Sequence, residues 1–147
     1  MMVRTFTWLT TLGAALLLVG CVASSPTPLS APSLQAGCVT GESMVQTTLY
    51  FGLNRPHGPA LSGQEWQSFV DRQVTPRFKQ GLSVFDARGQ WLGNEGQLVR
   101  ENSKALVLIH MAGKASEADI EALRANYKQQ FSQDSVMRVD APVCVAF

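Results

Sequence analysis

The order of alternating and helically spaced apolar residues constrains the fold of this 147-residue chain more than any other feature of its sequence. Over 44–53 the side chains alternate in character, with Leu49 and Phe51 on one side and Tyr50 on the other. A period of two predicts a strand with one face towards a core. Prolines and a glycine follow at 54–59, so we expect this strand to end in a loop.

A helix is predicted after this loop. Ser62 and Glu65 have the spacing of a capping box, in which each side chain accepts a backbone N–H at the start of a helix. Apolar residues recur at helical spacing from Trp66 to Val74. Because Pro76 disfavours a helical conformation at the residue before it, we expect the helix to end close to that proline.

Two further strands and a turn are predicted in the middle of the chain. The alternation over 82–87, which continues towards Trp91, predicts the second strand. Residues 93–96 are typical of a turn, and we expect 98–100 to pair across it. The run 104–111 is almost entirely apolar after its lysine, which is typical of a central strand with both faces covered.

The last part of the chain predicts a second helix and an edge strand. Ser116 and Asp119 have the spacing of a capping box with aspartate in place of glutamate, so we expect the helix to open at Ser116. The apolar residues at helical spacing, which we expect on its inner face, are Ile120, Leu123, Tyr127 and Phe131. The last strand, over 136–147, contains Pro142, and proline favours an edge position.

The resulting order, β-α-β-β-α-β, predicts an α+β fold of the ferredoxin-like, split β-α-β type. We expect an antiparallel sheet of order 4-1-3-2, with right-handed crossovers and two helices on one face. The last strand then pairs antiparallel with the first, which brings Cys144 close to Cys38. In an oxidising compartment such a pair is most simply a disulfide, and two buried free thiols are the alternative.

The first part of the chain, 1–20, differs in kind from the rest. Arg4 is its only charged residue, and a short apolar or weakly polar stretch follows. This pattern predicts a secretory signal peptide, because the stretch is too short and too rich in threonine for a membrane span. Residues 18–21, Leu-Val-Gly-Cys, resemble a bacterial lipobox. We therefore expect cleavage before Cys21 and double or triple acylation of that cysteine. An ordinary signal peptide with a chance cysteine is the alternative.

The expected domain organisation follows from this leader. Residues 21–37 are rich in proline, serine, alanine and threonine, and they predict a disordered tether. The folded α+β domain is expected over 38–147. The protein would then be anchored through lipid on Cys21 in the bacterial cell envelope, on the periplasmic side. Val22, rather than an aspartate, follows the cysteine, which favours the outer membrane.

The charge balance limits the partners. The chain has 12 basic and 11 acidic residues, and removal of Arg4 with the signal peptide leaves 11 of each. A neutral domain without a run of like charges lacks the basic surface that nucleic acid requires, so no nucleic acid is expected. The sequence contains no nucleophile elbow, phosphate-binding loop or paired metal-ligand spacing. We therefore expect no cofactor and no metal.

A few polar residues are weak candidates for catalysis. His57 lies in the Pro/Gly loop, and Arg77, Asp86 and Arg100 belong to a polar group in the middle of the chain. A carboxylate beside an arginine can act as a general base or help to bind an anion. The sequence favours the alternative, which is ion pairing across the predicted hairpin. His110 lies in the most apolar strand and is interpreted as a structural histidine.

One face of the sheet is expected to lack helices. Tyr50 and Phe85 alternate out of phase with the residues that face the helices, and so apolar a face is rarely left in water. The tether, a second copy of the domain or a ligand are the alternatives that could cover it. The tether offers only Leu29 and Leu34 as large apolar side chains. We therefore expect a two-fold homodimer through this face.

Short motifs recur along the whole predicted domain. They are Leu49-Tyr50-Phe51-Gly52-Leu53-Asn54-Arg55-Pro56, Glu65-Trp66, Thr75-Pro76-Arg77-Phe78, Gly81-Leu82, Gly89-Gln90-Trp91, Arg100-Glu101-Asn102-Ser103-Lys104 and Arg138-Val139-Asp140. In these motifs the chain resembles domain of unknown function family 3574, over about 38–147. The resemblance implies bacterial envelope lipoproteins or secreted proteins, and it implies no reaction.

Two functions remain open at this point. The first is a lipid-anchored envelope protein whose domain binds a protein or a small ligand. The anchor, the tether and the missing catalytic motif favour it. The alternative is a small cofactor-free enzyme of the dimeric α+β barrel type, a hypothesis based on fold analogy. It requires His57, Arg77 and Asp86 to converge in one pocket.

Overall fold

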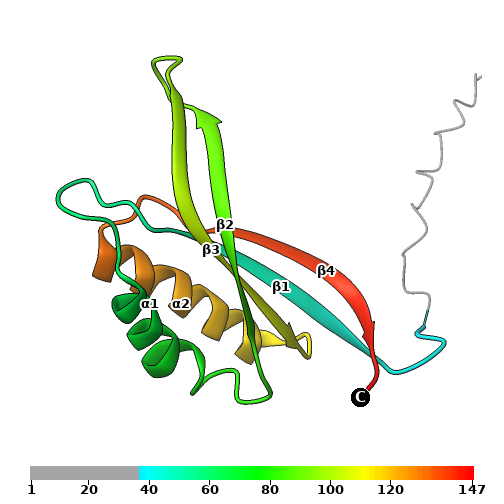
Figure 1. Cartoon of the computed structure of the whole chain (residues 1–147). Helices are drawn as coiled ribbons and strands as arrows, with labels where there is room; N and C mark the ends of the chain where they lie inside the picture. The colour runs from blue at the N-terminus through cyan, green and yellow to red at the C-terminus, as the bar shows by residue number, and fades with distance from the viewer. Residues whose placement is uncertain (1–36) are drawn as a thin grey trace, which may run out of the picture. The chain divides into compact units, whose positions relative to one another are not determined.

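Seven elements make up residues 37–147, the part of the chain that the computed structural model describes (Figure 1). In chain order they are β1 (Glu42–Gly52), α1 (Gly63–Phe69), the π-helix η1 (Val70–Val74), β2 (Ser83–Leu92), β3 (Leu98–His110), α2 (Lys114–Phe131) and β4 (Met137–Val145). The predicted signal peptide, the predicted lipidation at Cys21 and the predicted tether up to residue 36 lie outside the described residues.

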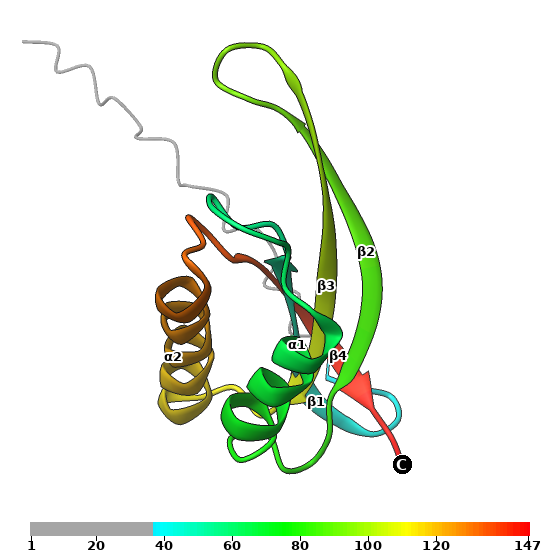
Figure 2. The same cartoon turned by 60° about the vertical axis from the view of Figure 1, so that its left-hand side comes forward.

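The strands form one antiparallel sheet in the order β2-β3-β1-β4. This is the predicted 4-1-3-2 order, read from the other edge. Both α1 and α2 lie on the same side of the sheet (Figure 2). The α+β, ferredoxin-like fold is therefore confirmed. β4 is an edge strand, and Pro142 lies in it opposite Val45, as its missing N–H predicts.

The first helix begins where its capping box predicts. The Ser62 hydroxyl accepts the backbone N–H of Glu65, and the Glu65 carboxylate accepts the N–H of Ser62 at 2.9 Å. The helix widens into η1, and Thr75 closes it with a backbone bond to Val70. Because Pro76 follows directly, the predicted end of this helix is also confirmed.

The start of the second helix differs from the prediction. α2 begins at Lys114, and Gly113 precedes it without a side-chain cap. Ser116 is already inside the first turn, where its hydroxyl donates to the carbonyl of Met111 at 2.9 Å. The prediction that Ser116 caps this helix was wrong, because a serine hydroxyl can donate to a carbonyl before the helix as well as accept an N–H.

The third strand is longer than predicted. The segments 98–100 and 104–111 are parts of one continuous strand, β3, because the polar residues between them pair with β2 through the backbone. The hairpin of β2 and β3 therefore extends well beyond the helices (Figures 1 and 2). We call its distal part, residues 88–101, the arm.

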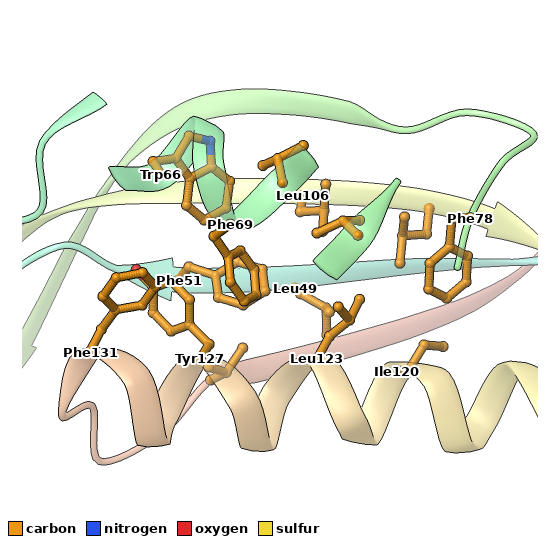
Figure 3. Close-up of a cluster of buried hydrophobic side chains, with 14 of the residues drawn as sticks. Leu49, Phe51, Trp66, Phe69, Phe78, Leu106, Ile120, Leu123, Tyr127 and Phe131 are labelled. Atoms are coloured by element: carbon orange, nitrogen blue, oxygen red, sulfur yellow. The ribbon is translucent and has the colours of Figure 1, made fainter. Parts of the chain in front are cut away.

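The core lies between the sheet and the two helices (Figure 3). Phe51 from β1 is fully buried, and its ring centroid lies 4.5 Å from that of Tyr127 and 5.3 Å from that of Trp66. The four residues predicted for the inner face of α2 are all buried: Ile120, Leu123, Tyr127 and Phe131. Apolar and aromatic packing of this kind supplies most of the driving force for folding.

A disulfide joins the two ends of the domain. Cys38 and Cys144 are bonded in the structure, with their Cα atoms 5.5 Å apart. The register of β4 on β1 places Cys144 opposite Ser43, so the end of the last strand lies beside the residues that precede the first. The topology thus produces the predicted pairing.

Candidate functional site

The sheet face opposite the helices is open over residues 37–147. We call it the open face, and its central side chains are Tyr50, Phe85, Ala105, Val107, Met137 and Val139. The strand register places Phe85, Ala105, Tyr50 and Met137 in one row across the four strands. Because side chains alternate along a strand and Phe51 is in the core, this row points away from the helices.

The open face is apolar and partly exposed. Phe85 is 59% exposed, Met137 56% and Val139 49%, which are high values for large apolar side chains. Tyr50 and Val107 are half-buried. The prediction that Tyr50 and Phe85 lie on a helix-free face is therefore confirmed. The run 104–111 lies in the central strand β3, as predicted, between β2 and β1. No element of residues 37–147 is packed on its second face, so the cover of that face stays a prediction.

The ion pairs of the sheet residues lie on the helix side. Asp86 pairs with Lys104, one position along the strands from Phe85 and Ala105, and so on the opposite face. Arg138 pairs with Asp140 and with Glu117 of α2. The centre of the open face carries no charged side chain.

A hollow of about 620 Å³ lies at the end of the open face nearest the arm. Its floor consists of small residues, because Gly52, Ser103 and Ala87 lie side by side on β1, β3 and β2. Tyr50 and Trp91 are among its larger lining side chains. A row of small residues beside aromatic ones can accept an inserted side chain or a flat ligand.

Glu101 and Gly52 connect this hollow to the core. The Glu101 carboxylate lies over Gly52, where an added Cβ would be 2.6 Å from its Oε1. The same Oε1 accepts the backbone N–H of Asn54 at 2.8 Å. From the core side, the Tyr127 hydroxyl donates to the Gly52 carbonyl at 2.7 Å. Burial raises the pKa of Tyr127, and the charge of Glu101 raises it further.

His57 lies beside a separate, polar hollow of about 460 Å³ near the end of α2. Arg55, which also lines it, donates to the Glu65 carboxylate at 2.5 Å and lies 5.8 Å from the ring centroid of Phe131. The pKa of Glu65 is lowered to about 2, first by the backbone N–H of Ser62 and then by Arg55. The charged groups beside His57 are therefore already paired with each other.

Arg77 lies near the other end of α2. Its Nε is 3.6 Å from the Asp119 carboxylate, and its Nη1 donates to the Gln73 carbonyl at 2.6 Å. Gln130 of the same helix lines the hollow at His57. The rise of 1.5 Å per residue separates Asp119 from Gln130 by about 16 Å. Arg77 and His57 are thus held near opposite ends of one helix.

The remaining catalytic candidates make cross-strand contacts on the hairpin. Asp86 is paired with Lys104, and Arg100 donates from its Nε to Gln90 at 3.0 Å. These contacts agree with the interpretation that the polar group forms pairs across the hairpin. Among the described residues, the convergence of His57, Arg77 and Asp86 that the enzyme hypothesis requires is not formed.

A buried polar network went unnoticed in the sequence. Thr47, fully buried on the helix side of β1, donates to Asp140 at 2.6 Å and lies 2.9 Å from His110 Nε2. His110 Nδ1 faces the carbonyl of Met111, so this histidine is buried and hydrogen-bonded. Burial raises the pKa of Asp140, but hydrogen bonds from Thr47 and Arg138 outweigh it and lower the pKa overall. The one sequence signal for this network was Thr47 itself, because a polar residue at a core-facing position of a strand requires a hydrogen-bond partner.

Two further features bear on function. Over residues 37–147, no three His, Cys, Asp or Glu side chains gather in a way that would hold a metal ion. In the same range, the helices are too short or too polar to cross a membrane.

The fold and the open face define a small ferredoxin-like α+β domain with one uncovered apolar sheet face. The chain belongs to the family described as protein of unknown function (DUF3574), whose profile matches residues 46–147. The resemblance carried by the short motifs is therefore confirmed. Comparison with curated protein sequences gives no match.

Solved structures of a phage SAM lyase support the fold. A phage SAM lyase in complex with S-methyl-5'-thioadenosine is similar, with 20% identity, a TM-score of 0.51, and coverage of 69% of this chain and 90% of the lyase. Its apo state gives the same TM-score. CutA from Synechococcus elongatus has 11% identity and a TM-score of 0.46, with coverage of 69% of this chain and 78% of CutA. At such identities the likeness to the lyase shows the fold alone.

Proposed function

We propose that this chain is a lipid-anchored protein of the bacterial cell envelope, and that its domain is a binding module with the open face as binding surface. One observation carries the proposal: Phe85, Met137 and Val139 are about half exposed or more on a face with no charge at its centre. Apolar patches of this kind on a folded domain mark sites of interaction.

The separation of the candidate catalytic residues supports binding over catalysis. Asp86 is paired with Lys104 on the hairpin, Arg77 is paired with Asp119, and His57 lies beside another hollow. Acid–base catalysis requires such groups to converge on one bound substrate. The open face offers area and shape instead, and it includes the hollow at Gly52.

The lipobox-like residues 18–21 and the disulfide support the location. A disulfide between Cys38 and Cys144 is stable in an oxidising compartment such as the periplasm. Acylation of Cys21 would hold the domain at the membrane, and more than one acyl chain is needed for a durable anchor. Val22 favours the outer membrane.

Lipid attachment is tested by Cys21→Ser, with Ser25→Ala as the control because it leaves the disulfide intact. We expect metabolic palmitate labelling and membrane recovery to be lost in Cys21→Ser and retained in Ser25→Ala. Separation of the two membranes by density should place the wild-type protein in the outer one. Palmitate labelling that survives Cys21→Ser would overturn the anchor, and recovery in the inner membrane would overturn the location.

The role of the open face is tested by photo-crosslinking in intact cells. A photoreactive amino acid replaces Phe85 in one variant and Leu92 in the other. Both residues are exposed apolar positions of β2, but Leu92 is out of phase with Phe85 and points to the other side of the hairpin. We expect a crosslinked protein product from position 85 and little from position 92. Equal or absent crosslinking at the two positions would overturn the proposal.

A further inference from the structure

We infer that the occupant of the open face is a second copy of this chain, with two open faces packed against each other about a two-fold axis. The inference rests on the proposed role of the open face as a binding surface, and it names the partner. A two-fold contact uses the same patch on both copies, so that patch must be compatible with itself.

The distribution of charge makes the open face compatible with itself. A charged side chain near a two-fold axis would meet its own copy in an environment from which water is excluded, and like charges there repel. The centre of the open face avoids that conflict, because Asp86, Lys104, Arg138 and Asp140 lie on the helix side. Glu101 is the charged sheet residue at the hollow, where its carboxylate lies over Gly52 and accepts the backbone N–H of Asn54. The side chains at the centre of the open face are apolar or uncharged.

The shape of the open face also allows it to pack against the same face of a second copy. Phe85 and Met137 project from its two edge strands and are 59% and 56% exposed. The hollow floored by Gly52, Ser103 and Ala87 lies on the same face. One surface thus provides both projecting side chains and a depression, which an isologous interface requires if it is to pack without voids.

The open face is large enough for a stable dimer. β1 pairs with β4 from Glu42 to Tyr50, and β3 and β2 extend the sheet on the other side. Four strands spaced about 4.8 Å apart, with nine residues of about 3.3 Å each, give a footprint of about 570 Å². The side-chain relief raises the accessible area towards the roughly 800 Å² per partner of a standard interface.

Other occupants fit this surface less well. The sequence between Cys21 and the domain offers Leu29 and Leu34 as its large apolar side chains, too few to cover four strands. A lipid surface would be attracted by lysine and arginine around the apolar area. The centre of the open face has neither, and Arg88 at the hollow is its one basic lining residue.

The test uses the domain from Gln35 to Phe147, which is one compact unit with its own core and disulfide. Sedimentation velocity over a concentration series gives its assembly state and dissociation constant. The variants are Phe85→Glu on β2 and Val139→Glu on β4, and Leu92→Glu is the matched control. Circular dichroism shows whether each variant is folded, and either open-face variant suffices if the other does not fold.

We expect a dimer for the wild type and for Leu92→Glu. Each open-face variant should raise the dissociation constant at least about 100-fold, because it buries an unpaired carboxylate. A folded wild-type domain that remains monomeric at about 200 µM would overturn the inference. A trimer or larger ring would overturn the two-fold pairing, and equal weakening by Leu92→Glu would overturn the placement on the open face.

The crosslinking experiment separates this inference from the proposed function. A product from position 85 with twice the mass of the chain supports both. A product that contains a different protein overturns the inference and leaves the binding function in place. No product at position 85 overturns the binding function itself.

Discussion

Gly52 shows how a single residue links the core to the open face. Its carbonyl accepts a hydrogen bond from Tyr127, and the space left by its missing side chain is filled by the Glu101 carboxylate. That carboxylate holds the backbone N–H of Asn54 at the start of the loop that carries His57. The glycine is required here for close approach, since a Cβ would collide with Glu101.

We predict that Gly52→Ala destabilises the domain by about 1–2 kcal/mol, because Glu101 must turn away and Asn54 loses a hydrogen bond to a charged acceptor. Urea unfolding measures the change. In a Glu101→Ala background the collision is absent, so the same substitution should be neutral or slightly stabilising through the reduced entropy of the unfolded chain. An equal cost in both backgrounds would show that the collision with Glu101 is not the cause.

The sequence predicted the character of individual residues better than their partners. An aspartate and a histidine near arginines suggested chemistry at Asp86 and His57, but pairing depends on register. Asp86 meets Lys104 because the β2–β3 hairpin places them opposite each other, 18 residues apart in the chain. In the sequence, Thr47 is a weakly polar residue of a predicted strand, with no sign of its partners. The folded sheet brings Asp140 and His110 within hydrogen-bond distance of its hydroxyl.

At the scale of elements, the start of α1 depends on a carboxylate with two roles. Glu65 completes the capping box with Ser62 and also pairs with Arg55, which lies at the edge of the hollow beside His57. The loop and the helix are therefore held together by one side chain. Its hydrogen bonds require the charged form, so the cap is sensitive to acid.

We predict an acid-dependent loss of stability that Glu65→Gln reduces. The pKa of Glu65 is about 2 in the folded protein, against a usual 4.5, because Ser62 and Arg55 favour the carboxylate. A lowered folded-state pKa stabilises above about pH 4.5, and the contribution is lost as the pH falls towards about 2. The urea midpoint followed from pH 6 to 2 should fall less in Glu65→Gln than in the wild type. Parallel curves would contradict the assignment.

Elements whose own residues show a clear apolar period or a capping motif could be predicted. Elements whose length depends on pairing with a neighbouring element could not. β1 and α1 carry their own alternation and cap, and both were found where expected. β3 continues through Glu101, Asn102 and Ser103 because β2 supplies backbone partners, a cause that no local pattern contains. α2 begins at Lys114 without a side-chain cap, so no capping residue in the sequence marks its start.

At the scale of the whole molecule, the domain separates charge from apolar area. The helices and the ion pairs of Arg138 lie on one side of the sheet, and Phe85 and Val139 lie on the other. This division was predictable, since the phase of each strand assigns its residues to one of two faces. The arm was not, because its length depends on the unbroken pairing of β2 and β3.

The disulfide closes the whole domain into one loop, and we predict that its removal is the most costly change to stability outside the core. Cys38 and Cys144 are 106 residues apart in sequence, and Cys144 lies in the edge strand β4. In the chain-entropy model a disulfide that closes a loop of this length stabilises the folded protein by about 4–5 kcal/mol, because it lowers the entropy of the unfolded chain.

The double variant Cys38→Ala, Cys144→Ala avoids a lone thiol. It should lower the free energy of unfolding by about that amount, measured with urea against the oxidised wild type. Peptide mapping without reductant should show the two cysteines linked in protein taken from cells. If both thiols are alkylated there, or if the double variant loses less than about 1 kcal/mol, the bridge does not stabilise the native domain in the way the fold indicates.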